Sequence, residues 1–281
     1  MNERALTEGE IWTADALADL RRGDLRPTAW IGFLQSSFER SSAFRSENPV
    51  LVRQARLWAW VGGAAWLALC ATTRGHSFSP RPTIGLLWWA CCWAMLDLHL
   101  GMAETPEGDR RGRLSAADAV TMSRFWLVPA LPAARASPPI LAALIAAGGA
   151  TDCLDGGLAR RDGPTRLGRD LDSTADIASL VTAAWVTRSA GRLPAPVTAV
   201  LATRYVLGIS LGFAAQLTGR RRPNLGARRS GGMLRVAGLA LAAGGLRRAG
   251  GALLLAGSIV PPRTARHRPP PRPAADGDDA R

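Results

Sequence analysis

The stretch GATDCLDGGLARRDGPTRLGRDLDSTADI, residues 149–177, sets aspartates at helical intervals within apolar surroundings. Asp152 and Asp155 lie three residues apart, and Asp172 and Asp176 lie four residues apart, so each pair falls on one face of a helix. The Gly-Pro pair in the hinge RDGPTRL interrupts the helix between the two pairs. We therefore expect two antiparallel helices that bring the acidic pairs face to face.

Carboxylates gathered in this way repel one another unless cations lie between them, and ionisable groups within a membrane are usually functional. Their oxygen ligands favour hard ions such as Mg²⁺ or Mn²⁺, and two such ions can neutralise a pyrophosphate and its leaving group. Gly156 and Ala159 share the face of Asp152 and leave room for a flat ligand against the helix backbone. Arg160 follows directly and can reach a phosphate. The stretch thus predicts a two-metal site for phosphoryl chemistry.

The alternative is that the aspartates cap helices and pair with neighbouring arginines. Asp162 and Asp170 lie off the two faces, and we expect them to act in that way. The other four form an ordered set, for which the metal site is the better explanation.

The elements that must position these residues are apolar segments separated by short basic hinges. Most of these segments come close to the roughly 20 residues that cross a bilayer. We expect an all-α polytopic membrane protein, with a soluble helical bundle as the alternative. The predicted spanning helices are 57–73, 83–101, 119–135, 139–160, 169–188, 194–218, 231–246 and 250–262, of which the last two are glycine-rich and can form a tight hairpin.

The arginines indicate the orientation of the helices. The chain has a net charge of +13, and its 35 basic residues are all arginine. The hinges at 103–118, 161–168 and 219–230 carry more of them than the opposite hinges, so the positive-inside bias places these three hinges in the cytoplasm. We expect a multi-pass protein of the cytoplasmic membrane whose aspartates face the cytoplasm. No zinc-binding, RRM or helix-turn-helix signature accompanies the charge, so no nucleic-acid partner is predicted.

The two ends of the chain carry separate expectations. Residues 1–56 are predicted to form a helical cytoplasmic or interfacial segment, in which Trp12, Trp30 and Phe33 lie either on the membrane interface or against the bundle. Residues 263–281 are rich in proline and arginine and are predicted to be disordered. No signal peptide is expected at the start. The cysteines are expected to be small buried hydrophobes: Cys70, Cys91, Cys92 and Cys153.

At the aspartate stretch the sequence resembles the CDP-alcohol phosphatidyltransferase family, whose pattern is D-x2-D-G-x2-A-R, about eight residues, and then G-x3-D-x3-D. Every specified position is filled here, with a spacer one residue shorter than the commonest one: Asp152, Asp155, Gly156, Ala159, Arg160, Gly168, Asp172 and Asp176. The segment DAVTMSRFWLVP (118–129) is similar to the N-x-x-T-x-x-R entry to the first core helix through Thr121 and Arg124, although Asp118 replaces the asparagine. The segment GARRS (226–230) is similar to the basic hinge before the fifth core helix through Arg229 and Ser230.

The resemblance implies a six-helix catalytic core at 118–262, preceded by two additional transmembrane helices and a loop at 57–117. It implies transfer of a phosphatidyl or related phosphoalcohol group from a CDP-linked lipid, such as CDP-diacylglycerol, to a small alcohol, with release of CMP. Such a reaction belongs to phospholipid biosynthesis. The resemblance further implies a homodimer.

The resemblance also implies roles for single residues. Asp152, Asp155 and Asp172 would hold one metal ion, and Asp152, Asp172 and Asp176 would hold a second. Asp176 would also be the general base for the acceptor hydroxyl. The expected substrate contacts are Gly156, Ala159, Arg160, Thr165, Thr121 and Arg229.

The acceptor and the function class leave alternatives open. Arg204 and the arginines of 220–229 could bind a phosphate on the acceptor, as in glycerol 3-phosphate or inositol phosphate, or could reflect membrane topology alone. A non-catalytic scaffold that keeps the fold is a second function, but no motif aspartate is lost. A divalent-cation transporter is a third, but only one end of the bundle is acidic.

Overall fold

The computed structural model describes residues 7–218 and 229–259, and the secondary structure of this part is helical, with turns and one isolated bridge. The all-helical class is confirmed for these residues. The helices are α1 (Glu8–Arg22), α2 (Pro27–Glu47), α3 (Pro49–Thr72), α4 (Pro82–Leu98), η1 (Leu100–Met102), α5 (Ala116–Leu127), α6 (Ala130–Ala133), α7 (Pro138–Asp162), α8 (Arg166–Ser189), α9 (Ala195–Leu217), α10 (Arg229–Ala243) and α11 (Arg247–Ile259).

Each predicted spanning segment coincides with helical structure, but some boundaries differ. The prediction of one helix over 119–135 is wrong, because α5 ends at Leu127 and Pro129, which lacks an N–H group, separates it from α6. Helix α3 begins at Pro49, inside the segment predicted to precede the membrane, since proline suits the first turn of a helix. The predicted end of the last helix, 260–262, lies outside the described residues.

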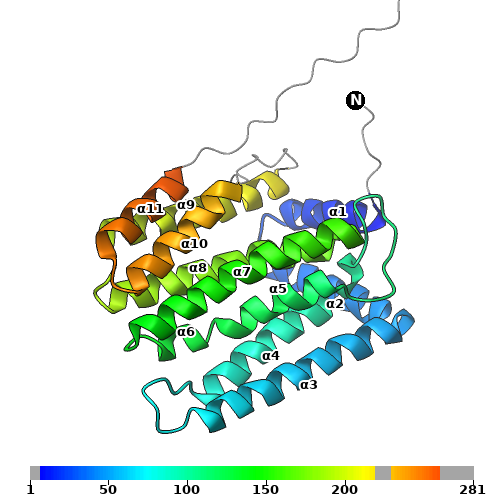
Figure 1. Ribbon diagram of the computed structural model, residues 1–281. Coiled ribbons are helices and arrows are strands. Elements are labelled where there is room, and N and C mark those ends of the chain that lie inside the picture. Colours follow the sequence, from blue (N-terminus) through cyan, green and yellow to red (C-terminus); the bar gives the residue numbers. More distant parts are fainter. Residues whose placement is uncertain (1–6, 219–228, 260–281) are drawn as a thin grey trace, which may run out of the picture.

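The long helices lie side by side, with α3 and α4 on one side, α9, α10 and α11 on the other, and α5, α7 and α8 between them (Figure 1). Two clusters of buried apolar side chains hold the layers together. One includes Leu141 of α7, Leu201 of α9 and Leu254 of α11. The other includes Leu96 of α4 and Phe125 of α5. Helix α8 contributes to both clusters, so its aspartates are fixed relative to both halves of the bundle.

Helices α10 and α11 form the predicted tight hairpin. A Cβ atom on Gly238 would lie 2.6 Å from the backbone nitrogen of Leu254, and one on Gly250 would lie 2.4 Å from that of Ala242. Glycine is therefore required where the two backbones meet, as in closely packed membrane helices.

Two helices of the described chain are long and apolar enough to cross a membrane, α7 and residues Ala195–Ala215 of α9. The shorter apolar helices include Pro82–Leu98 and Ser230–Ala243. Large apolar side chains also point outward, with Trp60 of α3 80% exposed and Val206 of α9 62% exposed. A lipid environment suits such a surface better than water does. The full count of spanning helices stays a prediction, as do the domain boundaries.

The N-terminal segment and the cysteines give one agreement and one correction. The predicted helices of residues 1–56 are present as α1 and α2, and Trp30 stacks on Phe213 of α9 at 6.4 Å, which favours packing against the bundle. The expectation that all four cysteines are buried is wrong. Cys70 and Cys92 are buried, whereas Cys91 and Cys153 lie on outward helix faces and are exposed.

Candidate active site

The hinge between α7 and α8 has the geometry that the sequence predicted. Helix α7 ends at Asp162 because Gly163 adopts a φ of +85°, a left-handed conformation that favours glycine. Helix α8 begins at Arg166, and Thr165 caps it by accepting a hydrogen bond from the backbone N–H of Gly168 at 2.9 Å. The chain therefore reverses within three residues and sets the two acidic faces against each other.

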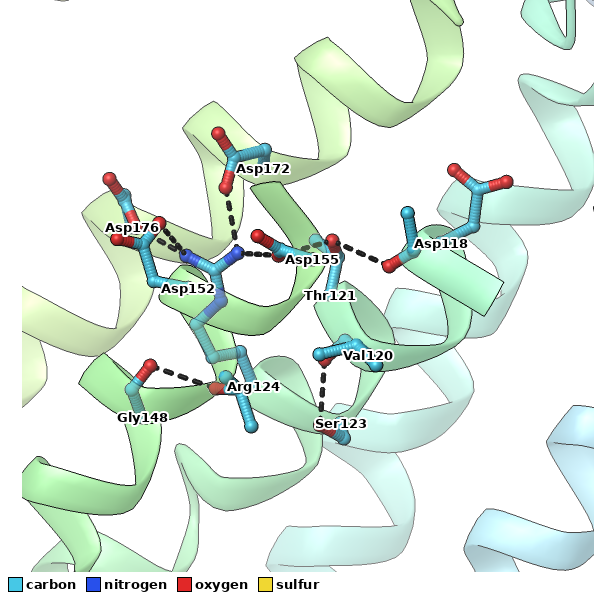
Figure 2. A network of polar contacts seen from close by, with 12 residues as sticks. Asp118, Val120, Thr121, Ser123, Arg124, Gly148, Asp152, Asp155, Asp172 and Asp176 are labelled. Atoms are coloured by element: carbon cyan, nitrogen blue, oxygen red, sulfur yellow. Dashed lines mark hydrogen bonds and ion pairs between the residues drawn. The ribbon is translucent and has the colours of Figure 1, made fainter. Parts of the chain in front are cut away.

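The four motif aspartates surround one buried arginine (Figure 2). Carboxylate oxygens of Asp152, Asp172 and Asp176 lie within 4.8 Å of one another. Arg124 of α5, whose side chain is 2% exposed, donates to Asp152 at 3.2 Å and to Asp172 at 2.7 Å. It also donates to Asp155 and Asp176. The predicted meeting of the acidic pairs is confirmed, and the guanidinium at their centre was not foreseen.

The position of Arg124 follows from the spacing of the T-x-x-R segment, which places Thr121 and Arg124 on the same face of α5. A buried guanidinium is tolerated only where opposite charges and hydrogen bonds compensate for its desolvation. Four carboxylates around one guanidinium still leave an excess of negative charge. The cluster therefore remains attractive to additional cations.

Asp155 accepts a hydrogen bond from Thr121. The Thr121 side chain is buried, and its hydroxyl lies 2.7 Å from a carboxylate oxygen of Asp155 and 3.0 Å from the carbonyl of Ala117. Asp155 itself is buried, unlike Asp172 and the other two aspartates of the cluster. Thr121 thus orients a motif carboxylate, and its predicted contact with a substrate stays a prediction.

Asp118 occupies the first turn of α5 in a capping box with Ser115. One of its carboxylate oxygens accepts hydrogen bonds from the backbone N–H and the hydroxyl of Ser115, both at 2.8 Å. The other is buried and has no hydrogen-bond partner among the described residues. Burial raises the pKa of the Asp118 carboxyl, although the bonds from Ser115 oppose the rise. A Cβ atom on Gly168 would lie 3.0 Å from this second oxygen, so the motif glycine allows α8 to approach α5.

A second group of polar side chains lies beyond Asp176, on α9 and α10. Arg235 is buried, donates to the carbonyl of Gly257 at 2.9 Å, and acts with its positive charge on the Asp176 carboxylate. Arg204 donates to the carbonyl of Ser258 at 3.1 Å. The sequence pointed to Arg204 as a phosphate contact but not to Arg235. The available signal was a lone arginine in the apolar segment MLRVAGLALAA, because charges inside such segments are costly and usually functional.

The remaining predicted substrate contacts lie along the α7 face and at the start of α10. The guanidinium of Arg160 lies beside Gly156, since a Cβ atom there would be 3.5 Å from one of its nitrogens. Ala159 belongs to the same helix face. The side chain of Arg229 and the arginines of 220–228 lie outside the described residues.

The residues present fit a divalent metal ion. Three carboxylate oxygens within 4.8 Å of one another form a hard, anionic ligand set of the kind that Mg²⁺ and Mn²⁺ prefer. The fourth, Asp155, lies next to this set but is engaged by Thr121 and Arg124. A narrow cavity of about 40 Å³ opens beside Asp152 and Asp176 and has apolar walls that include Leu131 and Ile145.

Comparison with protein-family models matches residues 114–260 to CDP-alcohol phosphatidyltransferase. The match covers more than half of the chain and contains all four clustered aspartates. The chain belongs to this family. No curated protein matches the chain, and no solved structure matches it.

Membership makes the protein a phosphotransferase of a membrane-associated family that moves a phosphatidyl group from a CDP-alcohol to an acceptor alcohol. The family generally uses divalent metal ions, and the aspartate cluster is a suitable place for one. Residues 7–113, which carry α1 to α4, precede the matched region.

Proposed function

We propose that this protein transfers the phosphatidyl group of a CDP-linked lipid such as CDP-diacylglycerol to a small alcohol that carries a phosphate, and releases CMP. The reaction would belong to phospholipid biosynthesis at the cytoplasmic membrane, with the aspartates facing the cytoplasm. The observation that carries the proposal is the convergence of Asp152, Asp172 and Asp176 within 4.8 Å, with the positive charge of Arg235 of α10 acting on Asp176.

The donor would bind along the aspartate face of α7. Gly156 and Ala159 leave the helix backbone accessible, and Arg160 beside them can pair with a phosphate. Thr165, which caps the start of α8, would contact the nucleotide part.

Divalent ions, Mg²⁺ or Mn²⁺, would be held by Asp152, Asp155, Asp172 and Asp176, and when bound they would neutralise the pyrophosphate. The acceptor hydroxyl oxygen would form a bond to the phosphatidyl phosphorus while the bond to the CMP oxygen breaks. Asp176 would take the hydroxyl proton as the attack proceeds. Arg124 would keep the carboxylates together, because it donates to all four.

An acceptor with a phosphate group suits the far side of Asp176. Arg204 and Arg235 add two positive charges on α9 and α10, and each donates a hydrogen bond to a backbone carbonyl. Positive charges between apolar helices cost free energy unless an anion binds to them. Glycerol 3-phosphate and inositol phosphate have the required chemistry. A homodimer stays a prediction from family membership.

The test is CMP release by purified protein in nanodiscs with CDP-diacylglycerol, Mg²⁺ or Mn²⁺ and one acceptor at a time. Glycerol 3-phosphate and inositol 1-phosphate are the expected substrates, and serine and phosphatidylglycerol are the unphosphorylated and lipid comparisons. Turnover with a phosphorylated acceptor that chelation and Asp172→Ala both abolish would support the proposal. Turnover with serine alone would refute the acceptor class, and a lack of CDP-donor binding would refute the donor.

A further inference from the structure

The segment that precedes the family match makes a polar contact with the hinge of the active site. Arg166, the first residue of α8, donates to the hydroxyl of Thr7 and to a carboxylate oxygen of Glu104, both at 2.7 Å. The Thr7 hydroxyl donates to the same oxygen of Glu104 at 2.9 Å. Glu10 of α1 lies 3.4 Å from the Arg166 guanidinium. We call Thr7, Glu104 and Arg166 the hinge clamp.

The loop that carries Glu104 and Arg111 forms further hydrogen bonds with both ends of the hinge. The N–H of Arg166 donates to the carbonyl of Glu104 at 2.9 Å, on the α8 side. On the α7 side, the Arg111 guanidinium donates to the carbonyl of Asp162 at 2.6 Å. A Cβ atom on Gly163 would lie 2.6 Å from that guanidinium, so glycine is needed there for the contact as well as for its positive φ.

Burial of the charged side chains of the hinge clamp costs free energy unless they remain paired. Thr7 and Glu104 are buried and the Arg166 side chain is 13% exposed, so loss of Glu104 removes the shorter of the two ion pairs that the structure shows for this guanidinium. An arginine at the start of a helix also opposes the helix dipole, which favours negative charge there. Helix α8 has no acidic residue in its first turn, so the compensating charge comes from Glu104 and Glu10, both outside the matched region.

The position of the hinge clamp connects it to the chemistry. Asp172 lies six residues after Arg166 on the same helix, about 9 Å along its axis at 1.5 Å per residue. The clamped loop also forms one wall of a cavity of about 620 Å³ whose lining includes Arg111, Arg113 and Thr165. Movement of the hinge would therefore change both the spacing of the aspartate pairs and the space beside the proposed nucleotide contact.

We propose that Thr7 and Glu104 of the N-terminal extension are positioning residues, which act through Arg166 to hold the α7–α8 hinge in the geometry that binds metal and the CDP part of the donor. This inference rests on the proposed function for the identity of the donor. It gives residues 7–113 a role in the reaction without placing any of them in contact with the reacting atoms.

The test compares the full chain with Glu104→Gln, which keeps the shape of the side chain but removes its charge, and with Thr7→Val, a milder change. The matched control is Glu8→Gln, because Glu8 also forms ion pairs within residues 7–113, with Arg40 and Arg110, but is exposed and has no ion pair with α8 among the described residues. The readouts are Mn²⁺ binding by electron paramagnetic resonance, CDP binding in the presence of Mn²⁺, and hydrogen exchange of the hinge amides. None of these requires turnover.

We expect Glu104→Gln to weaken Mn²⁺ and CDP binding by about tenfold, the lower end of what loss of an outer-shell partner costs at a metal centre. Hinge exchange should be faster, and Glu8→Gln should match the unaltered protein. If Glu104→Gln does not fold, Thr7→Val must show the same changes to a smaller degree. Unchanged Mn²⁺ and CDP affinities in folded variants, even with lowered thermal stability, would overturn the proposal. Failure of the proposed function would instead appear as an unaltered protein that binds Mn²⁺ and CDP and releases no CMP.

Discussion

The buried arginine at the centre of the aspartates leads to a prediction about metal affinity. Arg124 donates to four carboxylates, so in Arg124→Gln these groups lose the guanidinium that they share in Figure 2. Without metal, that variant should be less stable by about 3–5 kcal/mol, the usual cost of removing one partner from a buried ion pair. Its aspartates should then bind a divalent ion more tightly than those of the unaltered protein.

The size of the gain follows from the scale of the cluster, whose carboxylate oxygens lie within 4.8 Å of one another. A unit charge and a divalent ion on the order of 4 Å apart repel by about 2 kcal/mol even at the dielectric constant of water. Removal of the guanidinium charge should therefore tighten Mn²⁺ binding by at least about 30-fold. The more deeply the guanidinium and the divalent ion are buried, the larger the gain in Mn²⁺ affinity should be.

The assay is Mn²⁺ titration followed by electron paramagnetic resonance, together with unfolding followed by tryptophan fluorescence at several Mn²⁺ concentrations. Arg188→Gln on α8 is the control, because this arginine is exposed. The variant should show a lower midpoint without metal and a larger rise with it. Weaker Mn²⁺ binding in Arg124→Gln would refute the electrostatic reasoning and would mean that the guanidinium mainly arranges the ligands.

Three further results are expected. Asp176→Asn should slow CMP release by about a thousandfold, the range of general-base catalysis, while CDP-donor binding measured by calorimetry persists; loss of donor binding would contradict a base role. Chelation should stop CMP release and added Mg²⁺ or Mn²⁺ should restore it, whereas Asp172→Ala should show no recovery at the same metal concentrations. Asp118→Asn should stabilise the protein by about 1 kcal/mol at pH 8, because burial raises the pKa of this carboxyl and its ionised form has one oxygen without a partner. A raised folded-state pKa means that stability falls as pH rises through it, so the gain should shrink on acidification in fluorescence-detected unfolding, and a gain that is equal at pH 4 and pH 8 would contradict this reading.

The sequence was sufficient to predict the local part of this architecture. Helical spacing placed the aspartates in pairs, and the Gly163-Pro164 break turned the second pair back toward the first, because both signals act over a few residues. The same reasoning failed at Pro129, which separates α5 from α6 within one apolar segment. Apolar pattern alone also did not separate cysteines on inward faces from Cys91 and Cys153 on outward faces.

Contacts between distant segments could not be predicted in this way. Arg124 reaches Asp176 across 52 positions of sequence, and Arg166 reaches Thr7 across 159. Nothing in the local spacing specifies which face of α5 packs against α7 and α8, or that a loop before α5 returns to the hinge. These contacts depend on the tertiary packing of helices, and one of them supplies the charge at the centre of the site.

The placement of charge around Asp176 bears on how two substrates could react there. Arg124 approaches this carboxylate from α5, and the charge of Arg235 acts on it from α10. The proposed contacts of the nucleotide part belong to α7 and to the start of α8, whereas Arg204 and Arg235 belong to α9 and α10. A donor and an anionic acceptor bound in these places would meet at Asp176 from different sides, which suits a direct displacement with the attacking and leaving oxygens apart. Arg235→Gln should then raise the KM for a phosphorylated acceptor and leave the donor KM nearly unchanged, and an equal rise in both would place the two substrates on the same side.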